Sequence, residues 1–142
     1  MGNHDTIKQI ISKFSGQANI ITIPKIYLDL LDGDYPAAAL LNQIVYWSDR
    51  SKNPGGWFYH ANHEWLEEIR LTYFQVKRST KILLDNQWIE CHVRRANGVP
   101  TTHYRVNMDK LIYSINQFLE IQETRNSRNS KIEKLEIQET SI

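Results

Sequence analysis

The chain has 142 residues, of which 41% are hydrophobic and 23% charged, and its formal net charge is +1. Its size and composition are typical of one soluble globular domain with short extensions. They exclude a membrane-spanning protein, because no stretch approaches the roughly 20 apolar residues of a membrane helix. The N-terminus lacks the basic and apolar pattern of a signal peptide, so we expect a cytoplasmic protein, associated with nucleoid or mobile-element DNA if it binds DNA.

The first half of the chain predicts a helical extension followed by the start of a folded domain. Residues 1–17 are polar with a short periodic run of isoleucines, and we expect a loosely attached N-terminal extension. The domain is expected to span residues 18–111. Its first elements, in chain order, are predicted as an extended segment at 20–23, a helix beginning at Pro24, a helix capped by Asp34 and running to Trp47, and an aromatic strand at 57–59.

Two helices separated by a very short turn are predicted next. Asn62 can cap a helix over 63–70, and Thr72 can cap a second helix over 73–87. About three residues between them force the helices to cross sharply, which is the spacing of a helix-turn-helix.

A β-hairpin is predicted directly after the second helix. Residues 88–95 and 101–106 have strand composition, and the segment between them contains Asn97-Gly98, a strong hairpin signal, although this loop looks longer than two residues. The sequence therefore predicts an α+β fold, a winged helix-turn-helix with a β-hairpin wing and flanking helices.

The C-terminal part predicts one more helix and a tail. Asn107 can cap a helix from Met108 to about Glu123, and residues 112–123 of it present exposed apolar positions. Pairing with the same helix of a second chain would bury these positions, so we expect a homodimer. Residues 124–142 are predicted to form a polar, flexible tail, because the run over 124–131 has no core-forming residue.

Positive charge is concentrated in the middle of the chain. Residues 70–105 hold seven basic and two acidic side chains, a local charge of +5, whereas the remaining ten basic and fourteen acidic groups sum to −4. A basic segment in a nearly neutral chain is expected of a protein that contacts nucleic-acid phosphates. Clustered charge can also be no more than a solvated surface.

A helical wheel of residues 73–87 separates an apolar side from a basic one. Val76, Ser79, Thr80 and Leu83 fall on the side predicted to pack inward. The opposite side holds Phe74, Lys77, Arg78, Lys81 and Asp85. A helix of this diameter fits the major groove of DNA, where its outward side chains meet phosphates and base edges.

The expected roles of these residues differ. Arg78 can bind guanine with two hydrogen bonds, whereas Lys77 and Lys81 act as point charges for phosphate. Arginines of the hairpin suit minor-groove or backbone contact, although Arg94 and Arg95 are adjacent and must point to opposite faces. The candidate DNA-binding residues are Thr72, Tyr73, Phe74, Gln75, Lys77, Arg78, Lys81, Arg94, Arg95, Asn97 and Arg105.

Motifs for catalysis, metals or cofactors are weak. His60 and His63 straddle a strand end and a helix start, and no tetrahedral ligand set is evident. The acidic residues at 64, 67 and 68 line the solvent side of a short helix, and no phosphate-binding glycine loop occurs. We expect a protein that is not an enzyme and that needs no metal or cofactor.

Several stretches resemble a known family. Residues 20–111 are similar to the winged-helix N-terminal domain of replication initiators, or replisome organisers, of bacteriophages and plasmids of Gram-positive-type mobile elements. Gln87 stands where the family usually has a glycine. The matching stretches are Ala38-Ala39-Leu40-Leu41, Tyr46-Trp47-Ser48-Asp49, Gly56-Trp57-Phe58-Tyr59, Leu71-Thr72-Tyr73-Phe74-Gln75-Val76-Lys77-Arg78, Trp88-Ile89-Glu90, Thr102-His103-Tyr104-Arg105-Val106 and Asp109-Lys110-Leu111.

The resemblance implies sequence-specific binding of double-stranded DNA at a replication origin, with the host replicative helicase or its loader as a further partner. Two alternatives stay open. One is a transcriptional regulator or partition protein on the same fold. The other is a winged-helix protein-interaction module that contacts its partner through Phe74 and the apolar stripe of residues 112–123.

Overall fold

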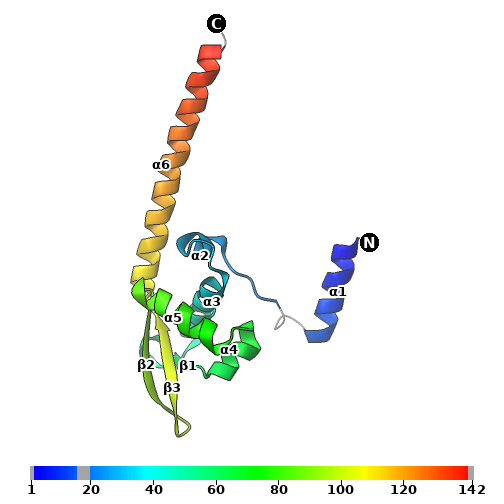
Figure 1. Ribbon diagram of the computed structural model, residues 1–142, viewed down its shortest axis with the longest axis vertical. Coiled ribbons are helices and arrows are strands. Elements are labelled where there is room, and N and C mark those ends of the chain that lie inside the picture. Colours follow the sequence, from blue (N-terminus) through cyan, green and yellow to red (C-terminus); the bar gives the residue numbers. More distant parts are fainter. Residues whose placement is uncertain (1, 16–19, 141–142) are drawn as a thin grey trace.

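The fold is described here from a computed structural model, in which residues 2–15 and 20–140 are described. Within these residues the chain has an α+β architecture of six α-helices and a three-stranded antiparallel sheet (Figure 1). The elements are α1 (Asn3–Ser15), α2 (Lys25–Leu30), α3 (Tyr35–Arg50), the 3-10 turn η2 (Pro54–Gly56), β1 (Phe58–Tyr59), α4 (Asn62–Ile69), α5 (Tyr73–Asp85), β2 (Ile89–Ala96), β3 (Val99–Val106) and α6 (Met108–Thr140).

Helix starts follow from local capping, as the sequence predicts. The Asp34 carboxylate accepts a hydrogen bond from the Ala37 amide at 3.2 Å at the start of α3. Asn107 caps α6 in the same way, through the Lys110 amide. These bonds satisfy amides that have no partner inside the helix. Asn62 does not cap α4 as predicted. It is the first helical residue, and the Glu64 carboxylate instead accepts from the Ala61 amide at 3.0 Å.

The sheet has the strand order β1-β3-β2, with both pairs antiparallel. The hairpin is tighter than the sequence predicts, because Ala96 pairs with Val99 and only two residues form the turn. Asn97 and Gly98 both have positive φ, at 52° and 80°, which is the requirement of a type I′ turn. The loop predicted over 96–100 is therefore two residues long. Its neighbours extend the strands and carry the hairpin tip away from the helices (Figure 1).

The core lies between the sheet and the helices that cover one face of it. Trp65 of α4 is fully buried, and its indole Nε1 donates to the Tyr104 hydroxyl of β3 at 3.3 Å. Leu40 and Ile44 of α3 and Leu83 of α5 are also fully buried in this cluster. Because α3, α4, α5 and β3 all contribute, the orientation of α5 is set by the core as a whole.

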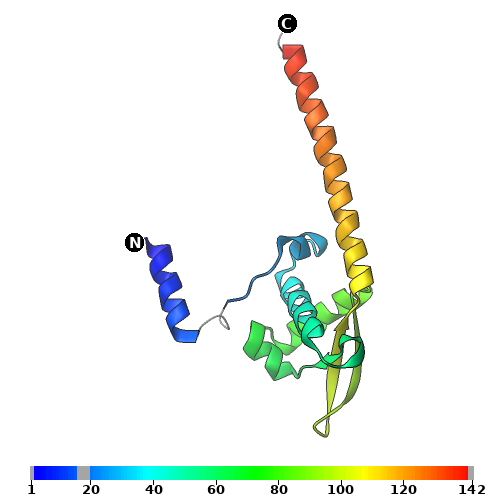
Figure 2. The same ribbon diagram turned by 180° about the vertical axis from the view of Figure 1, so that it is seen from behind.

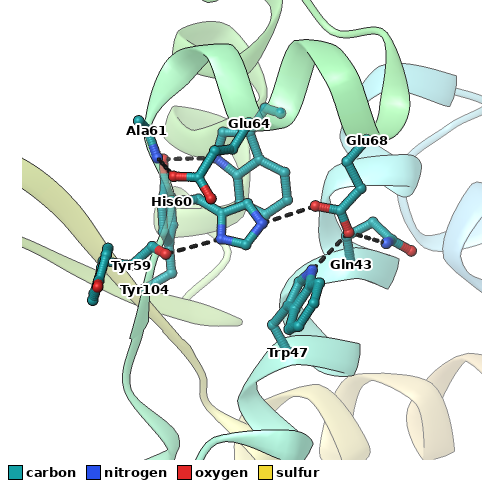
Figure 3. A network of polar contacts seen from close by, with 9 residues as sticks. Gln43, Trp47, Tyr59, His60, Ala61, Glu64, Glu68 and Tyr104 are labelled. Carbon is teal, nitrogen blue, oxygen red and sulfur yellow. Dashed lines mark hydrogen bonds and ion pairs between the residues drawn. The ribbon is translucent and has the colours of Figure 1, made fainter.

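A partly buried polar network joins α3, β1 and α4 (Figure 3). The Glu68 carboxylate accepts hydrogen bonds from Gln43 Nε2 and Trp47 Nε1, each at 2.6 Å, and from His60 Nε2 at 2.8 Å. The other ring nitrogen of His60 faces the Tyr59 carbonyl at 2.9 Å. Both ring nitrogens therefore face acceptors, and only a doubly protonated imidazolium can donate to both.

The pKa values of this pair move in the direction that an ion pair requires. Burial of His60 favours its neutral form, but its hydrogen bonds to Glu68 and to the Tyr59 carbonyl outweigh burial and raise its pKa. Burial likewise opposes the charge of Glu68, and its three donors outweigh that effect and lower its pKa. All the polar atoms of this pair are engaged in the fold, so we assign it a structural role.

Two helices extend beyond the core. Figures 1 and 2 show α6 rising from the end of the sheet opposite the hairpin tip, and α1 standing apart from the other helices. The prediction of a helix in the N-terminal extension is confirmed for Asn3–Ser15, and residues 1, 16 and 17 of that extension lie outside the described residues.

The predicted end of the C-terminal helix near Glu123 is wrong. The structure continues α6 to Thr140, across the segment predicted as a polar tail. Residues 112–140 contain no proline and no glycine, so the polar run has nothing that breaks the backbone hydrogen-bond pattern of the helix. Low apolar content was a poor guide to the helix boundary here.

Candidate nucleic-acid interface

The helix α5 has one buried and one exposed side, as the wheel predicts. Val76, Ser79 and Leu83 are buried against the neighbouring elements. Phe74, Lys77, Arg78, Lys81 and Asp85 are exposed on the opposite side. A shallow hollow of about 500 Å³ lies among these side chains and reaches Ile82. We call these five exposed residues the α5 face.

The first turn of α5 uses two of the candidate residues for capping. The Gln75 amide donates to the Thr72 hydroxyl at 3.3 Å, and the Thr72 amide donates to the Gln75 side-chain oxygen at 2.9 Å. This reciprocal capping box fixes the start of the helix, and both side chains stay exposed. Beside it, Tyr73 and Phe74 meet edge to face with ring centroids 5.4 Å apart. Phe74 is 78% exposed, which is unusual for a phenylalanine of a folded domain.

Arg78 is held by an acidic residue from another helix. Its Nη2 lies 2.7 Å from Asp34 Oδ2, and its Nη1 lies 3.4 Å from Asp34 Oδ1. The bond from Arg78 lowers the Asp34 pKa, an effect that partial burial opposes and the Ala37 amide reinforces. Asp34 therefore caps α3 and, at the same time, orients the guanidinium of Arg78 on the α5 face.

The two lysines of this face differ in their partners. Lys81 Nζ lies 3.0 Å from Asp85 Oδ2, four residues along the same helix, and both side chains are exposed. A solvent-exposed pair of this kind is weak, so Lys81 can exchange Asp85 for a phosphate at little cost. Within the described part of the chain, no hydrogen bond or ion pair engages the Lys77 ammonium.

The hairpin divides its arginines between two sides of the sheet. Tyr104 is buried against Trp65, and its neighbour Arg105 points to the opposite side, because strand residues alternate. Cross-strand pairing aligns Arg94 with Thr101, on the same side as Arg105, and aligns Arg95 with Pro100, on the same side as Tyr104. The structure thus brings Arg95 to the side of the sheet that α4 and α5 cover, and places Arg94 and Arg105 on the other.

Arg105 is also less available than the sequence suggests. Its Nε donates to the Glu90 carboxylate across the strand pair, and its guanidinium lies 5.0 Å from the centroid of the Trp57 ring. Of the three hairpin arginines, only Arg94 and Arg95 have side chains without a hydrogen bond or ion pair to any described residue. Asn97 occupies the exposed turn.

The ion pairs that restrain these cations differ in how far the sequence alone predicts them. The spacing of Lys81 and Asp85, four residues apart on one helix, is readable from the sequence as an ion pair. The Asp34–Arg78 contact joins residues 44 positions apart, and nothing local indicates it. The Glu90–Arg105 pair depends on the strand register, which the two-residue turn determines.

Neither a scan against protein-family models nor a search of curated proteins finds a match to this chain. Among the described residues, no helix is long and apolar enough to cross a bilayer. In the same residues, histidine, cysteine and carboxylate side chains do not gather in a group of three or more that could hold a metal ion.

Proposed function

We propose that this chain is a winged-helix protein that binds double-stranded DNA, with α5 in the major groove and the β2–β3 hairpin as the wing. The observation that carries the proposal is the α5 face, where Lys77, Arg78 and Lys81 are exposed on one side of a helix whose other side is buried. A helix anchored in this way presents its cations as a rigid set, which suits contact with a regular array of phosphates.

Arg95 and Asn97 extend this surface. They belong to the part of the hairpin beyond the buried core, and Arg95 lies on the side of the sheet that α4 and α5 cover. An arginine at the base of an exposed turn suits contact with the backbone or the minor groove beside the site of α5. Arg94 and Arg105 are left out of this duplex surface, because they lie on the opposite side of the sheet.

The resemblance of residues 20–111 to phage and plasmid replication initiators supports a replication origin of a mobile element as the DNA site. Footprinting distinguishes this role from the alternatives. Repeated protected sites within an origin support replication, whereas a single palindrome over a promoter supports transcriptional regulation. A helicase or its loader is proposed as a partner only with the origin role.

We propose a homodimer that forms through α6. Ile112 and Leu119 are exposed and lie one heptad apart, so they occupy one stripe of the helix. Replacing both with glutamate is expected to convert a dimer to a monomer in sedimentation velocity. The matched control is Gln117→Glu, on the other side of α6, which should leave the dimer intact. A monomer in the unmodified chain would contradict the proposal.

The duplex proposal is tested by gel shift with a DNA site selected from a random pool. The double variant Lys77→Ala and Arg78→Ala is expected to abolish the shift while the far-ultraviolet circular dichroism stays unchanged. Since removing Arg78 also exposes the Asp34 charge, Lys77→Ala alone is measured beside it. Arg125→Ala with Arg128→Ala removes two exposed charges from α6 and is the matched control. Unchanged binding by the double variant would overturn the docking of α5.

A further inference from the structure

The side of the sheet that faces away from Trp65 carries a regular array of rings and charges. We call it the outer face and define it by the residues that the cross-strand register and ring contacts place there: Trp57, Tyr59, Glu90, His92, Arg94, Thr101, His103 and Arg105. Tyr59, His103 and His92 form one row across all three strands, because Tyr59 pairs with His103 and His103 with His92.

The rings of the outer face contact one another. The Tyr59 and His103 centroids are 5.3 Å apart, and the His103 and His92 rings are nearly parallel at 5.5 Å. The Trp57 ring continues the row diagonally, with its centroid 4.1 Å from that of His92. Four flat side chains from the three strand segments thus form one continuous aromatic surface.

This surface is more exposed than the other side of the same strands, with Tyr59 and Arg94 exposed and the other six residues half-buried. None of the eight outer-face residues is buried, whereas Phe58, Ile89, Tyr104 and Val106 of the inner side all are. Tyr59 remains 43% exposed. The network of Figure 3 begins one residue after it, which holds the end of β1 in place.

The charges that border the rings suit a polyanion. Arg94 is exposed at one end of the array, and Arg105 lies over Trp57 at the other, with Glu90 as its counter-ion. The pKa of His92 is lowered, first by burial and then by the neighbouring positive charges, which favours a neutral ring suited to stacking. Aromatic rings beside an exposed arginine and a half-buried one match the bases and phosphates of an unpaired strand, whose bases are free to stack.

We propose that the outer face binds single-stranded nucleic acid, with bases stacked on the Tyr59–His103–His92–Trp57 surface and phosphates on Arg94 and Arg105. This proposal is independent of duplex binding, because the α5 face lies on the other side of the sheet. A protein partner is less suited to the surface, since charged and imidazole groups occupy most of it and no aliphatic side chain lies among its rings.

The test measures fluorescence anisotropy of a labelled oligodeoxythymidylate of about 16 nucleotides with the full chain. Tyr59→Ala is expected to weaken binding at least about fivefold, whereas Tyr59→Phe keeps the ring and should retain the affinity. Tyr46→Ala removes a similarly exposed tyrosine from α3 and is the matched control. Arg94→Gln should weaken binding and reduce the slope of log affinity against log salt by about 0.7. Glu90→Gln should strengthen binding, because it removes the acid that competes for Arg105.

Three outcomes overturn the proposal. The first is no binding of the oligomer by the unmodified chain at low salt, and the second is loss of binding in Tyr46→Ala but not in Tyr59→Ala. The third is a change of oligomeric state in Tyr59→Ala, which would make this face a protein interface. Duplex binding is measured in the same variants. If Tyr59→Ala still binds duplex DNA, the outer face and the α5 face are separate binding surfaces. If neither the unmodified chain nor any variant binds duplex DNA, the duplex proposal fails and the single-strand measurement still tests the outer face. If Tyr59→Ala unfolds, the opposing changes expected of Arg94→Gln and Glu90→Gln still decide the matter.

Discussion

The guanidinium of Arg78 and the carboxylate of Asp34 form a bidentate ion pair between α5 and the start of α3, in which Nη2 lies 2.7 Å from Oδ2. The Arg78 side chain is nevertheless mostly exposed, and Asp34 is mostly covered. Asp34 therefore orients Arg78 and also places a negative charge beside any phosphate or base that approaches it. To bind guanine with both nitrogens, Arg78 has to exchange Asp34 for the base.

Asp34→Asn is expected to increase affinity for duplex DNA. Asparagine is as good a helix cap as aspartate, so α3 should keep its capping bond and the free energy of unfolding should change by only a few tenths of a kcal/mol. The negative charge beside Arg78 is lost, and the guanidinium becomes free for DNA. The control is Asp32→Asn, which removes an exposed charge from the same turn at a positive-φ position that asparagine tolerates. Equal effects of the two variants on anisotropy with duplex DNA would refute a specific role for Asp34.

Gln87→Gly is expected to stabilise the protein. Gln87 has φ of 62°, the left-handed conformation, immediately after α5 and its cap. A residue with a Cβ is strained there and glycine is not, so the free energy of unfolding should rise by about 0.5–1 kcal/mol. Gln87→Ala keeps the strain and removes the rest of the side chain, and it should unfold at nearly the same urea concentration as the unmodified chain. A glycine variant that unfolds at lower urea would show that the Gln87 side chain itself stabilises the turn.

The His60–Glu68 pair is expected to make stability depend on pH. The folded pKa of His60 is raised, so its stabilising contribution is complete below the unfolded value of about 6.5 and is lost as pH rises through the folded value. The free energy of unfolding should therefore fall across this window, by up to about 1.4 kcal/mol per pH unit. Glu68 acts at the other end, where its contribution is lost as pH falls below about 4.3 towards its lowered pKa.

Urea unfolding at a series of pH values checks this dependence. His60→Gln should flatten the decline above pH 6.5, and the same substitution at the exposed His63 is the control. A His60→Gln variant whose stability falls as steeply as that of the unmodified chain would assign the pH dependence to other groups.

The sequence was most informative where structure depends on near neighbours. Caps at Asp34, Thr72 and Asn107 are confirmed, because each involves an amide three residues away. The buried side of α5 is also confirmed, since helical periodicity determines it. The order of helices and strands follows from the same local patterns, with most boundaries shifted by one to three residues and the end of α6 shifted from Glu123 to Thr140.

Contacts between distant segments could not be read from the sequence. Glu68 draws its donors from Gln43, Trp47 and His60, and nothing in their local sequence indicates that they meet. The division of Arg94 and Arg95 between two sides was predictable from strand alternation, but which of them shares a side with α5 depends on the fold. The fold also determines that Arg105 lies on the side of the sheet away from α5, where it pairs with Glu90.

If the α5 face binds duplex DNA, removing the Lys77 charge must weaken the salt dependence of binding. Lys77 is exposed and has no polar partner in the described residues, so its loss disturbs no contact of the fold. Anisotropy titrations with a selected duplex are made between roughly 50 and 200 mM salt. The slope of log affinity against log salt should be smaller by about 0.9 for Lys77→Gln than for the unmodified chain. Lys131→Gln on α6 should leave the slope unchanged. Equal slopes for the unmodified chain and Lys77→Gln, at equal affinity, would show that Lys77 contacts no phosphate and would refute binding of duplex DNA by the α5 face.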